Sequence, residues 1–238
     1  IKKFQTLSPE ALILLTEVLN PQEFGVAVVD ETGRVKKLVE KPKEPPSNLA
    51  LGGVYIFNPR IYTAIDNIQH SCRNELEITE AIQWLLDNNY KVESCMVKGW
   101  WKDTGKPEDI IEANLLILED IATSNQGTLI DTVVNGRVRI EAGAVIEKSV
   151  IRGPVVIGKN ARITRAFIGP FSSIGENVVI ENSEIECSLI MEGARITNLE
   201  KRIDRSIIGR NVIINQTEQS PRTNKFIIGD QSHLEIVK

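Results

Sequence analysis

The sequence predicts two architectures in succession, an α/β layer structure and then a left-handed parallel β-helix of hexapeptide repeats. Two observations lead to this prediction. Over residues 1–122, short apolar runs typical of strands alternate with apolar stripes at helical spacing, which is the pattern of an α/β domain. Over residues 128–238, one short phrase rich in isoleucine recurs at a nearly constant interval.

The repeat has the form Ile-x-x-(Gly or Asn)-(Ala or Val)-x-Ile, and its successive starts are 17, 17, 16 and 18 residues apart. Further aliphatic residues between the repeats divide each coil into three short steps. We expect one aliphatic side chain per step to fill the interior, with glycine or asparagine at a corner where φ is positive. The repeats start at Ile140, Ile157, Ile174, Ile190 and Ile208, and the corner residues are Gly143, Asn160, Asn177, Gly193 and Asn211.

The first half predicts a sheet whose strands are interrupted by helices. Apolar runs and alternating patterns indicate strands, and stripes with a period near four indicate helices. A segment with three prolines over residues 41–48 can only be a loop. The predicted strands span residues 11–16, 24–30, 34–41, 49–57 and 91–97, and the predicted helices span residues 59–68, 78–86 and 107–121.

Composition excludes several classes of function. The chain has 238 residues, 25% of them charged, and a formal net charge of -4, so it is not expected to bind nucleic acid. No apolar run approaches the ~20 residues that span a bilayer. Three isolated cysteines suggest no disulfide framework, so we expect a reducing cytoplasmic location. Ile1 is no natural initiator, and we expect the sequence to be a fragment.

Four places in the first half could carry chemistry, and each has an ordinary structural explanation. Gly25 could form a bulge, and Glu40-Lys41-Pro42 could be an exposed strand end. The pair Gly52-Gly53 could serve close packing, although strand ends that meet in a crevice of an α/β sheet are where ligands bind. Asp103 could hydrogen-bond within its own Asp-Thr-Gly turn. Taken singly, none of these indicates a site.

Taken in order, these motifs resemble the sugar-1-phosphate nucleotidylyltransferases, and among them most of all the long-form glucose-1-phosphate thymidylyltransferases, which carry a C-terminal β-helix. The resemblance extends over nearly the whole chain. It implies a Rossmann-like mixed sheet that is only partly present, with the sugar-binding half over residues 1–122. The matching motifs are Phe24-Gly25-Val26, Glu40-Lys41-Pro42, Gly53-Val54-Tyr55, Glu77-Ile78-Thr79-Glu80, Gly99-Trp-Trp-Lys-Asp-Thr-Gly105 and Phe226-Ile-Ile-Gly-Asp-Gln-Ser232.

The resemblance implies transfer of a nucleotidyl group from a nucleoside triphosphate, dTTP, to glucose 1-phosphate, giving dTDP-glucose and pyrophosphate. Gly25 would then offer a backbone group to the sugar, and Glu40 would accept hydrogen bonds from its hydroxyl groups. Lys41 would hold the attacking phosphate, as a catalytic residue. The remaining substrate-binding residues implied by the resemblance are Gly53 and Tyr55 in the sugar pocket and Thr79 at its rim.

The family resemblance also implies a magnesium ion. Asp103 would be a catalytic residue and one of two carboxylates that hold Mg²⁺, which neutralises charge on the α-phosphate. The second carboxylate belongs to a Gly-Asp-Asn stretch of the family, and the phosphate loop to a Gly-x-Gly-Thr-Arg stretch, and this sequence contains neither. We therefore expect this chain alone not to turn over.

Two other functions remain open for the β-helix. Acyltransferases with such repeats generally use a histidine base, but the chain has only His70 and His233, and no histidine lies between Thr128 and Asn215. The β-helix could instead be a non-catalytic arm for oligomerisation or regulation, which is the role we prefer for residues 128–238. A homo-oligomer is the expected assembly.

Overall fold

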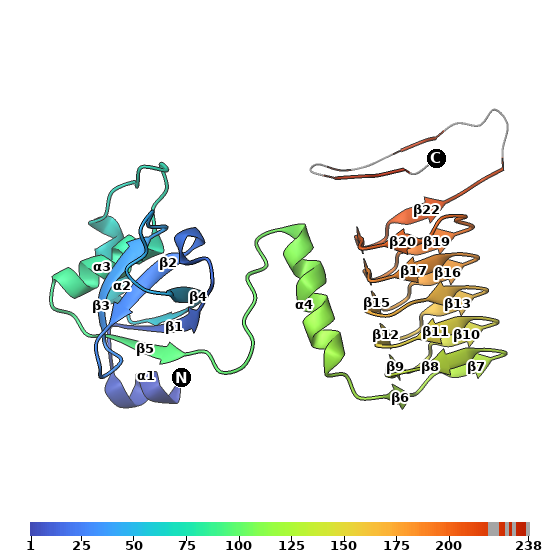
Figure 1. Ribbon diagram of the computed structural model, residues 1–238, viewed down its shortest axis with the longest axis horizontal. Helices are drawn as coiled ribbons and strands as arrows, with labels where there is room; N and C mark the ends of the chain where they lie inside the picture. The colour runs from blue at the N-terminus through green and yellow to red at the C-terminus, as the bar shows by residue number, and fades with distance from the viewer. Residues whose placement is uncertain (219–223, 227–228, 230–231, 237–238) are drawn as a thin grey trace. The chain divides into compact units, whose positions relative to one another are not determined.

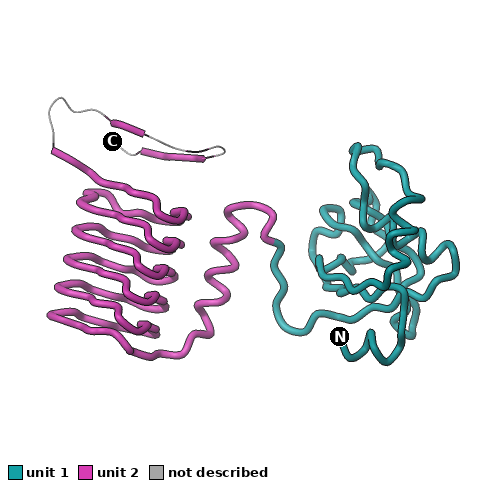
Figure 2. Tube along the Cα trace, turned by 180° about the vertical axis from the view of Figure 1, so that it is seen from behind, with its two compact units in different colours: residues 1–103 teal, residues 104–238 magenta. Residues whose placement is uncertain are grey.

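The computed structural model describes residues 1–218, 224–226, 229 and 232–236 of the chain. It divides into two compact units, Ile1–Asp103 and Thr104–Lys238, which Figure 2 colours separately. Part of the terminal motif of residues 226–232 lies outside the described residues. In the part of the chain that is described, no helix is long and apolar enough to cross a membrane.

The first unit is built on a five-stranded mixed sheet with the order β3-β2-β4-β1-β5 (Figure 1). β1 lies inside the sheet, antiparallel to β4 and parallel to β5, while β2 pairs with β3 as an antiparallel hairpin. The predicted strands are all present and differ from the observed ones by at most one residue at either end. The observed bounds are β1 (Ala11–Glu17), β2 (Gly25–Val29), β3 (Val35–Glu40), β4 (Leu49–Phe57) and β5 (Val92–Met96).

Two predicted helices, α2 (Arg60–Asp66) and α3 (Ile78–Asp87), contribute to the core of this unit. Ile61 of α2 and Ile82 of α3 are buried in the same cluster as Ile13 of β1. The short 3₁₀ turn η1 (Pro21–Glu23) precedes β2, and a further helix, α1 (Lys2–Leu7), was not predicted. It buries no residue and therefore has no apolar stripe to find.

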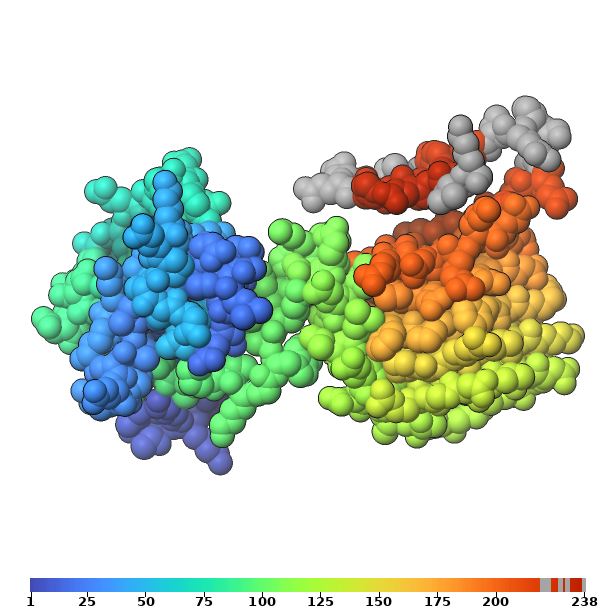
Figure 3. Space-filling view, viewed as in Figure 1, coloured from blue at the N-terminus to red at the C-terminus, as the bar shows by residue number. Residues whose placement is uncertain are grey.

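The second unit contains a parallel β-solenoid of about five turns, which confirms the predicted change of architecture. Three parallel sheets form its sides, with the orders β22-β19-β16-β13-β10-β7, β20-β17-β14-β11-β8 and β21-β18-β15-β12-β9-β6. The coils follow one another in chain order along the solenoid (Figure 3). The strands are β6 (Ser124–Asn125), β7 (Thr128–Ile130), β8 (Val133–Asn135), β9 (Val138–Ile140), β10 (Val145–Glu147), β11 (Val150–Arg152), β12 (Val155–Ile157), β13 (Arg162–Thr164), β14 (Phe167–Ile168), β15 (Ser172–Ile174), β16 (Val179–Glu181), β17 (Glu184–Glu186), β18 (Leu189–Ile190), β19 (Arg195–Thr197), β20 (Ile203–Asp204), β21 (Ile207–Ile208) and β22 (Ile213–Asn215).

Stacked isoleucines fill the interior of the solenoid, as the repeat predicts. Ile146, Ile163, Ile180 and Ile196 occupy equivalent positions on successive strands, and each is fully buried. Burying such a side chain stabilises the fold by about 1.5–3 kcal/mol, so the columns supply most of the cohesion of this unit. The cluster continues through the other two sheets, for example at Ile151.

The predicted corners are confirmed, but the structure has a second series that the sequence did not predict. All of the predicted corner residues have positive φ, from 56° at Asn160 to 77° at Gly143. Lys148 and Arg165 also have positive φ, both 48°, at the corner between the first and second sheets. A lysine or arginine carries no sequence signal for this conformation, because its side chain disfavours it.

Helix α4 (Pro107–Glu119) packs on the solenoid and belongs to the second unit, although the sequence placed it with the first. Its buried stripe contains Ile111, Asn114 and Leu118. Asn114 Nδ2 donates a hydrogen bond to Phe171 O (3.0 Å), and Ser173 Oγ donates one to Asn114 Oδ1 (2.6 Å). The helix therefore covers the sheet that contains β15.

We predict that Ile163→Ala lowers the free energy of unfolding by about 2–5 kcal/mol, because it leaves a cavity in the stacked interior. Urea unfolding followed by circular dichroism measures this loss. Arg162→Ala, at the exposed neighbouring position, is the control and should change stability by no more than about 0.5 kcal/mol. Equal losses for the two variants would contradict the assignment of Ile163 to the interior.

Candidate functional site

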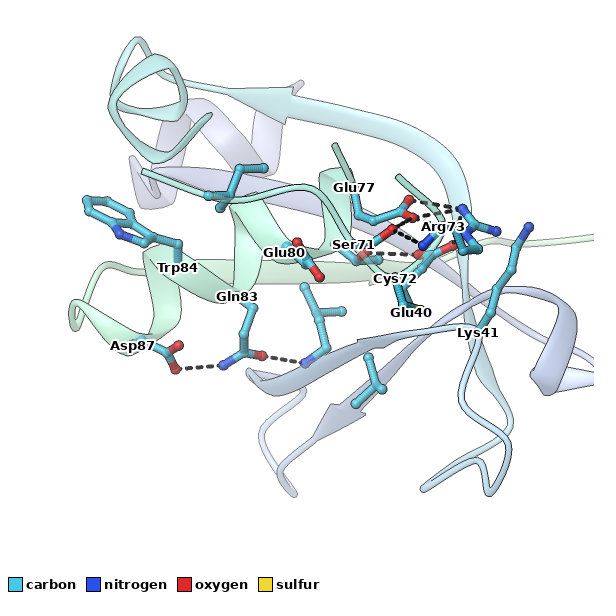
Figure 4. A pocket seen from close by; sticks show the side chains of 14 residues that line it. Glu40, Lys41, Ser71, Cys72, Arg73, Glu77, Glu80, Gln83, Trp84 and Asp87 are labelled. Carbon is cyan, nitrogen blue, oxygen red and sulfur yellow. Dashed lines mark hydrogen bonds and ion pairs between the residues drawn. The ribbon is translucent and has the colours of Figure 1, made fainter. Parts of the chain in front are cut away.

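A pocket of about 480 Å³ lies between the end of β3 and the start of α3 in the first unit (Figure 4). Its lining mixes charged and apolar side chains. Three of the residues that the sequence singled out line it, namely Glu40, Lys41 and Thr79. Charged groups to which the sequence assigned no role also line it, among them Arg73, Glu77, Glu80 and Asp87.

The carboxylate of Glu40 is the centre of the polar contacts in this pocket. Its Oε2 accepts a hydrogen bond from Thr79 Oγ1 (2.9 Å), and its Oε1 lies 3.7 Å from Arg73 Nη2. The side chain of Glu40 keeps 20% of its surface accessible, so a ligand can still reach it. Thr79 itself is buried, with 2% of its surface exposed. Thr79 of α3 therefore fixes Oε2 of Glu40, while Oε1 faces the guanidinium of Arg73.

Arg73 is held by a second carboxylate. Its guanidinium donates to both oxygens of Glu77 (2.9 and 3.1 Å) and to Glu75 Oε2 (2.7 Å). The hydrogen bond with Glu77 raises the pKa of Arg73 above its usual range. Ser71 Oγ also donates to Glu77 Oε1 (2.8 Å). Because Glu77 is 7% exposed, this network fixes the loop before α3 and keeps a permanent positive charge beside Glu40.

Lys41 directly follows β3 and adopts a backbone conformation that is unfavourable for lysine. Its φ is 38°, and its backbone N–H donates to Phe24 O (3.0 Å). A residue with a Cβ loses about 1–2 kcal/mol in this region of φ. The left-handed turn brings the lysine onto the pocket wall, where Figure 4 shows its side chain extending past Glu40. Strain held at a charged pocket residue favours a functional role for it.

Gly25 lies opposite Glu40 in the β2–β3 ladder, and the space beside it is already occupied. A Cβ on Gly25 would stand 2.5 Å from Thr79 Cγ2 and 2.9 Å from Glu40 Oε2. Tyr55 on β4 is also near this group. Burial raises the pKa of the Tyr55 phenol, and the negative charge of Glu40 raises it further. The structure thus gathers Gly25, Glu40, Thr79 and Tyr55 from four different elements.

Four of the predicted site residues are not among those lining this pocket, namely Gly25, Gly53, Tyr55 and Asp103. Gly53 is exposed with a φ of 75°, and a Cβ added to it would meet no atom within 4 Å. Asp103 is exposed as well, two residues after Trp101. Trp101 Nε1 donates to Gly52 O (3.1 Å), which ties the Trp-Trp-Lys-Asp segment to β4. Trp101 also contacts Phe24 edge to face, with ring centroids 5.5 Å apart.

The described part of the chain offers an incomplete donor set for a magnesium ion. Among the described residues, no group of three or more His, Cys, Asp or Glu side chains is arranged to hold a metal. Mg²⁺ is usually held by one or two carboxylates together with phosphates and water. Asp103 by itself would supply only one such carboxylate, so the residues described here do not make up a metal site.

Sequence reasoning missed the network of Ser71, Arg73 and Glu77, although it noted the motif that begins at Glu77. The signal was weak, because an Arg-x-Glu-x-Glu stretch before a helix is also typical of an exposed loop. Only the burial of Glu77, at 7% exposure, separates this network from ordinary surface ion pairs.

Known proteins are similar to both halves of this chain. The family model described as nucleotidyl transferase matches residues 1–120, which is half of the chain and contains the whole pocket. The chain belongs to the nucleotidyl transferase family. Members of this family typically use Mg²⁺.

Three curated relatives extend the similarity through the solenoid. A glucose-1-phosphate thymidylyltransferase of Streptomyces antibioticus is 46% identical over 229 residues, covering 96% of this chain and 64% of that protein. The enzyme of the same name from Streptomyces griseus is 42% identical over 238 residues, covering 99% and 66%. A low-salt glycan biosynthesis nucleotidyltransferase of Haloferax volcanii is 43% identical over 240 residues, covering 99% and 67%. The chain therefore spans about two thirds of the length of these transferases.

We predict that Gly25→Ala destabilises the first unit by about 1–3 kcal/mol, because its methyl group overlaps Thr79 Cγ2. The free energy of unfolding in urea measures the loss. Thr79→Ser removes Cγ2 but keeps the hydroxyl that binds Glu40, so Gly25→Ala should cost less in the Thr79→Ser variant, where only the 2.9 Å approach to Glu40 Oε2 remains. If Gly25→Ala costs the same stability in the native chain and in the Thr79→Ser variant, the contact with Thr79 Cγ2 does not cause the loss.

Proposed function

We propose that the protein to which this chain belongs transfers a nucleotidyl group from dTTP to glucose 1-phosphate, forming dTDP-glucose and pyrophosphate, as part of nucleotide-sugar biosynthesis. The family membership supports the reaction class. The two thymidylyltransferases from Streptomyces support the choice of nucleotide and sugar by their names and by identities of 46% and 42%. In this proposal the first unit supplies the sugar-binding half of the active site.

The observation that supports this function best is the fixed carboxylate of Glu40 beside two cations, Lys41 and Arg73. A sugar phosphate presents hydroxyl donors at one end and an anion at the other. Glu40 retains lone pairs that can accept hydrogen bonds from hydroxyl groups, while the ammonium group of Lys41 suits the phosphate. A sugar phosphate whose hydroxyl groups bind Glu40 and whose phosphate binds Lys41 would lie along the pocket wall beside these two residues.

Other residues shape the sugar end of this site. In the proposal the backbone of Gly25 offers a polar group to the sugar, and the missing side chain leaves the space that Thr79 and Glu40 occupy. The hydroxyl of Thr79 keeps the Glu40 carboxylate in one orientation. In the proposal Tyr55 and Gly53 on β4 complete the sugar pocket. Catalysis of phosphoryl transfer depends mainly on positioning and on stabilising charge, so no covalent nucleophile is needed.

In this proposal Asp103 contributes one of the carboxylates that hold the magnesium ion of the whole enzyme. This chain contains neither the second carboxylate nor the glycine-rich phosphate loop of the family. We therefore assign to these 238 residues the binding of the sugar phosphate, and not the complete reaction.

For the solenoid we propose a structural role in assembling a homo-oligomer in the cytoplasm. Acyl transfer has less support. His233 is exposed, and its ring lies 3.2 Å from Glu235 Oε1, while the coils between Thr128 and Asn215 contain no histidine. Transfer of an acetyl group from acetyl-CoA to an amino-sugar phosphate, lost in His233→Ala, would favour the acyltransferase instead.

We predict that the chain binds glucose 1-phosphate and that Lys41→Asn weakens this binding by about 10–100-fold, because a charge-assisted hydrogen bond contributes about 1.5–3 kcal/mol. Asparagine tolerates the left-handed backbone of Lys41, so the substitution removes the charge without adding strain. Isothermal titration calorimetry measures both dissociation constants.

Lys43→Asn provides the matched control, since Lys43 is exposed in the following loop and does not line the pocket. Its effect on affinity should stay within about twofold. If both lysine variants weaken binding equally, general electrostatic attraction explains the affinity, and the site assigned to Lys41 is wrong.

A second prediction concerns turnover. With dTTP, glucose 1-phosphate and Mg²⁺, we expect no dTDP-glucose or pyrophosphate from the purified 238-residue chain. Chromatographic detection of dTDP-glucose above the level of an enzyme-free control would overturn the division of labour proposed here. Formation of dTDP-glucose would still agree with nucleotidyl transfer as the reaction of the whole protein.

A further inference from the structure

The guanidinium of Arg73 stands near three carboxylates and forms hydrogen bonds with only two of them (Figure 4). It donates to Glu77 through Nε (3.1 Å) and Nη2 (2.9 and 3.1 Å), and to Glu75 through Nη2 (2.7 Å). The distance from Nη2 to Oε1 of Glu40 is 3.7 Å, which is too long for a hydrogen bond. A movement of about 0.8 Å would shorten it to the usual ~2.9 Å. Arg73 is therefore within reach of Glu40 without binding it.

Burial makes Glu77 the stronger of the two partners. The side chain of Glu77 keeps 8% of its surface exposed, whereas that of Glu75 keeps 63%. Because water screens a buried ion pair less than an exposed one, Glu77 attracts the guanidinium more strongly. Ser71 Oγ donates to Oε1 of Glu77 (2.8 Å), which fixes the orientation of this carboxylate. Glu77 is also the N-cap residue of α3, so the start of that helix fixes its backbone.

A direct contact between Arg73 and Glu40 would close the acceptor that a sugar needs. A carboxylate has about four lone-pair sites for donors, and Thr79 Oγ1 already uses one of them on Oε2 of Glu40 (2.9 Å). A guanidinium binds a carboxylate best through two parallel hydrogen bonds, one to each oxygen. Such a pair would cover the 20% of the Glu40 side chain that is still exposed. Hydroxyl groups could then not compete with a charged donor for the same oxygens.

We propose that Glu77 is a positioning residue, which holds Arg73 away from Glu40 and so keeps the Glu40 carboxylate open to sugar hydroxyl groups. The class of ligand rests on the function proposed above. The start of α3 supplies both parts of this arrangement, because Glu77 restrains the guanidinium and Thr79, two residues later, orients the carboxylate. The Glu-x-Thr spacing therefore prepares Glu40 as an acceptor from two sides.

Two other roles for Glu77 predict different behaviour. If Glu77 only stabilised the loop of residues 71–75, its loss would lower stability, and the removal of Arg73 would not repair sugar binding. If Glu77 itself accepted sugar hydroxyl groups, the removal of Arg73 would not repair binding either. The second role also has little room, because both oxygens of Glu77 bind Arg73 and its side chain is only 8% exposed. Repair of binding by the loss of Arg73 is specific to the positioning role.

The crystal structure of the Glu77→Gln variant tests the restraint on Arg73 directly. Glutamine keeps the shape of the side chain and loses its charge, so the guanidinium should move to within about 3.2 Å of a Glu40 oxygen. Glu75→Gln is the matched control, because Glu75 binds the same Nη2 but is mostly exposed. In that control the distance should stay near the native 3.7 Å. A guanidinium that keeps its native distance in Glu77→Gln would overturn the proposal.

Binding of methyl α-glucoside to the whole chain, followed by the NMR shifts of Gly25 and Thr79, tests the consequence for the sugar. This probe has sugar hydroxyl groups and no phosphate, so it does not recruit the cations of the pocket. Glu77→Gln should raise its dissociation constant by at least about tenfold, because hydrogen bonds to a charged acceptor are lost. Adding Arg73→Met should bring the constant back to within about threefold of the native value. The double variant also leaves no unpaired charge in the buried network.

A milder variant keeps the test valid if Glu77→Gln does not fold, which circular dichroism would show. Ser71→Ala loosens Glu77 without removing a charge and should weaken glucoside binding by about two- to fivefold. Native-like binding in Glu77→Gln or in Ser71→Ala, or a double variant as weak as the single one, would overturn the positioning role. A native chain that binds glucose 1-phosphate but no glucoside at about 100 mM would overturn it as well and leave the proposed function intact. A native chain that binds the glucoside but not glucose 1-phosphate would contradict the proposed function alone.

Discussion

The candidate site depends on a single carboxylate, that of Glu40. It lies at the end of β3, where Thr79 of α3 and Arg73 of the preceding loop approach its two oxygens. Gly25 must be a glycine because Glu40 and Thr79 occupy the space of a side chain there. Lys41 adopts its strained turn directly after this carboxylate. A partly buried carboxylate is unfavourable without such partners, so the surrounding residues follow from the need to hold it.

The solenoid was predictable from sequence because its structure repeats. At a constant period, isoleucine marks the buried column and glycine or asparagine marks the positive-φ corner, as at Ile163 and Asn160. Prediction failed where the backbone imposes a conformation on residues that do not favour it, such as Lys148 and Arg165. A helical stripe shows that a helix has a buried face and does not show which unit covers it. Helix α4 packs on the solenoid, while the family model that matches residues 1–120 includes it with the preceding sheet.

The site was only partly predictable, for a different reason. Motifs identified Glu40, Lys41 and Thr79, and the structure brings these into one pocket. Arg73 was missed, because its importance comes from the burial of Glu77 and from contacts between segments more than thirty residues apart. Asp103 remains outside the pocket lining, at the end of the first unit, so its role depends on the reaction proposed for the whole enzyme.

The central claim is that this unit already holds a sugar-phosphate site around Glu40. Titration of the isotopically labelled chain with glucose 1-phosphate, followed by NMR, tests it most directly. The account predicts saturable shifts of the Thr79 methyl group and of the backbone amides of Gly25 and Lys41, and little change at Trp84, at the other end of the pocket. Shifts concentrated at Trp84, or none at saturating ligand, would contradict it.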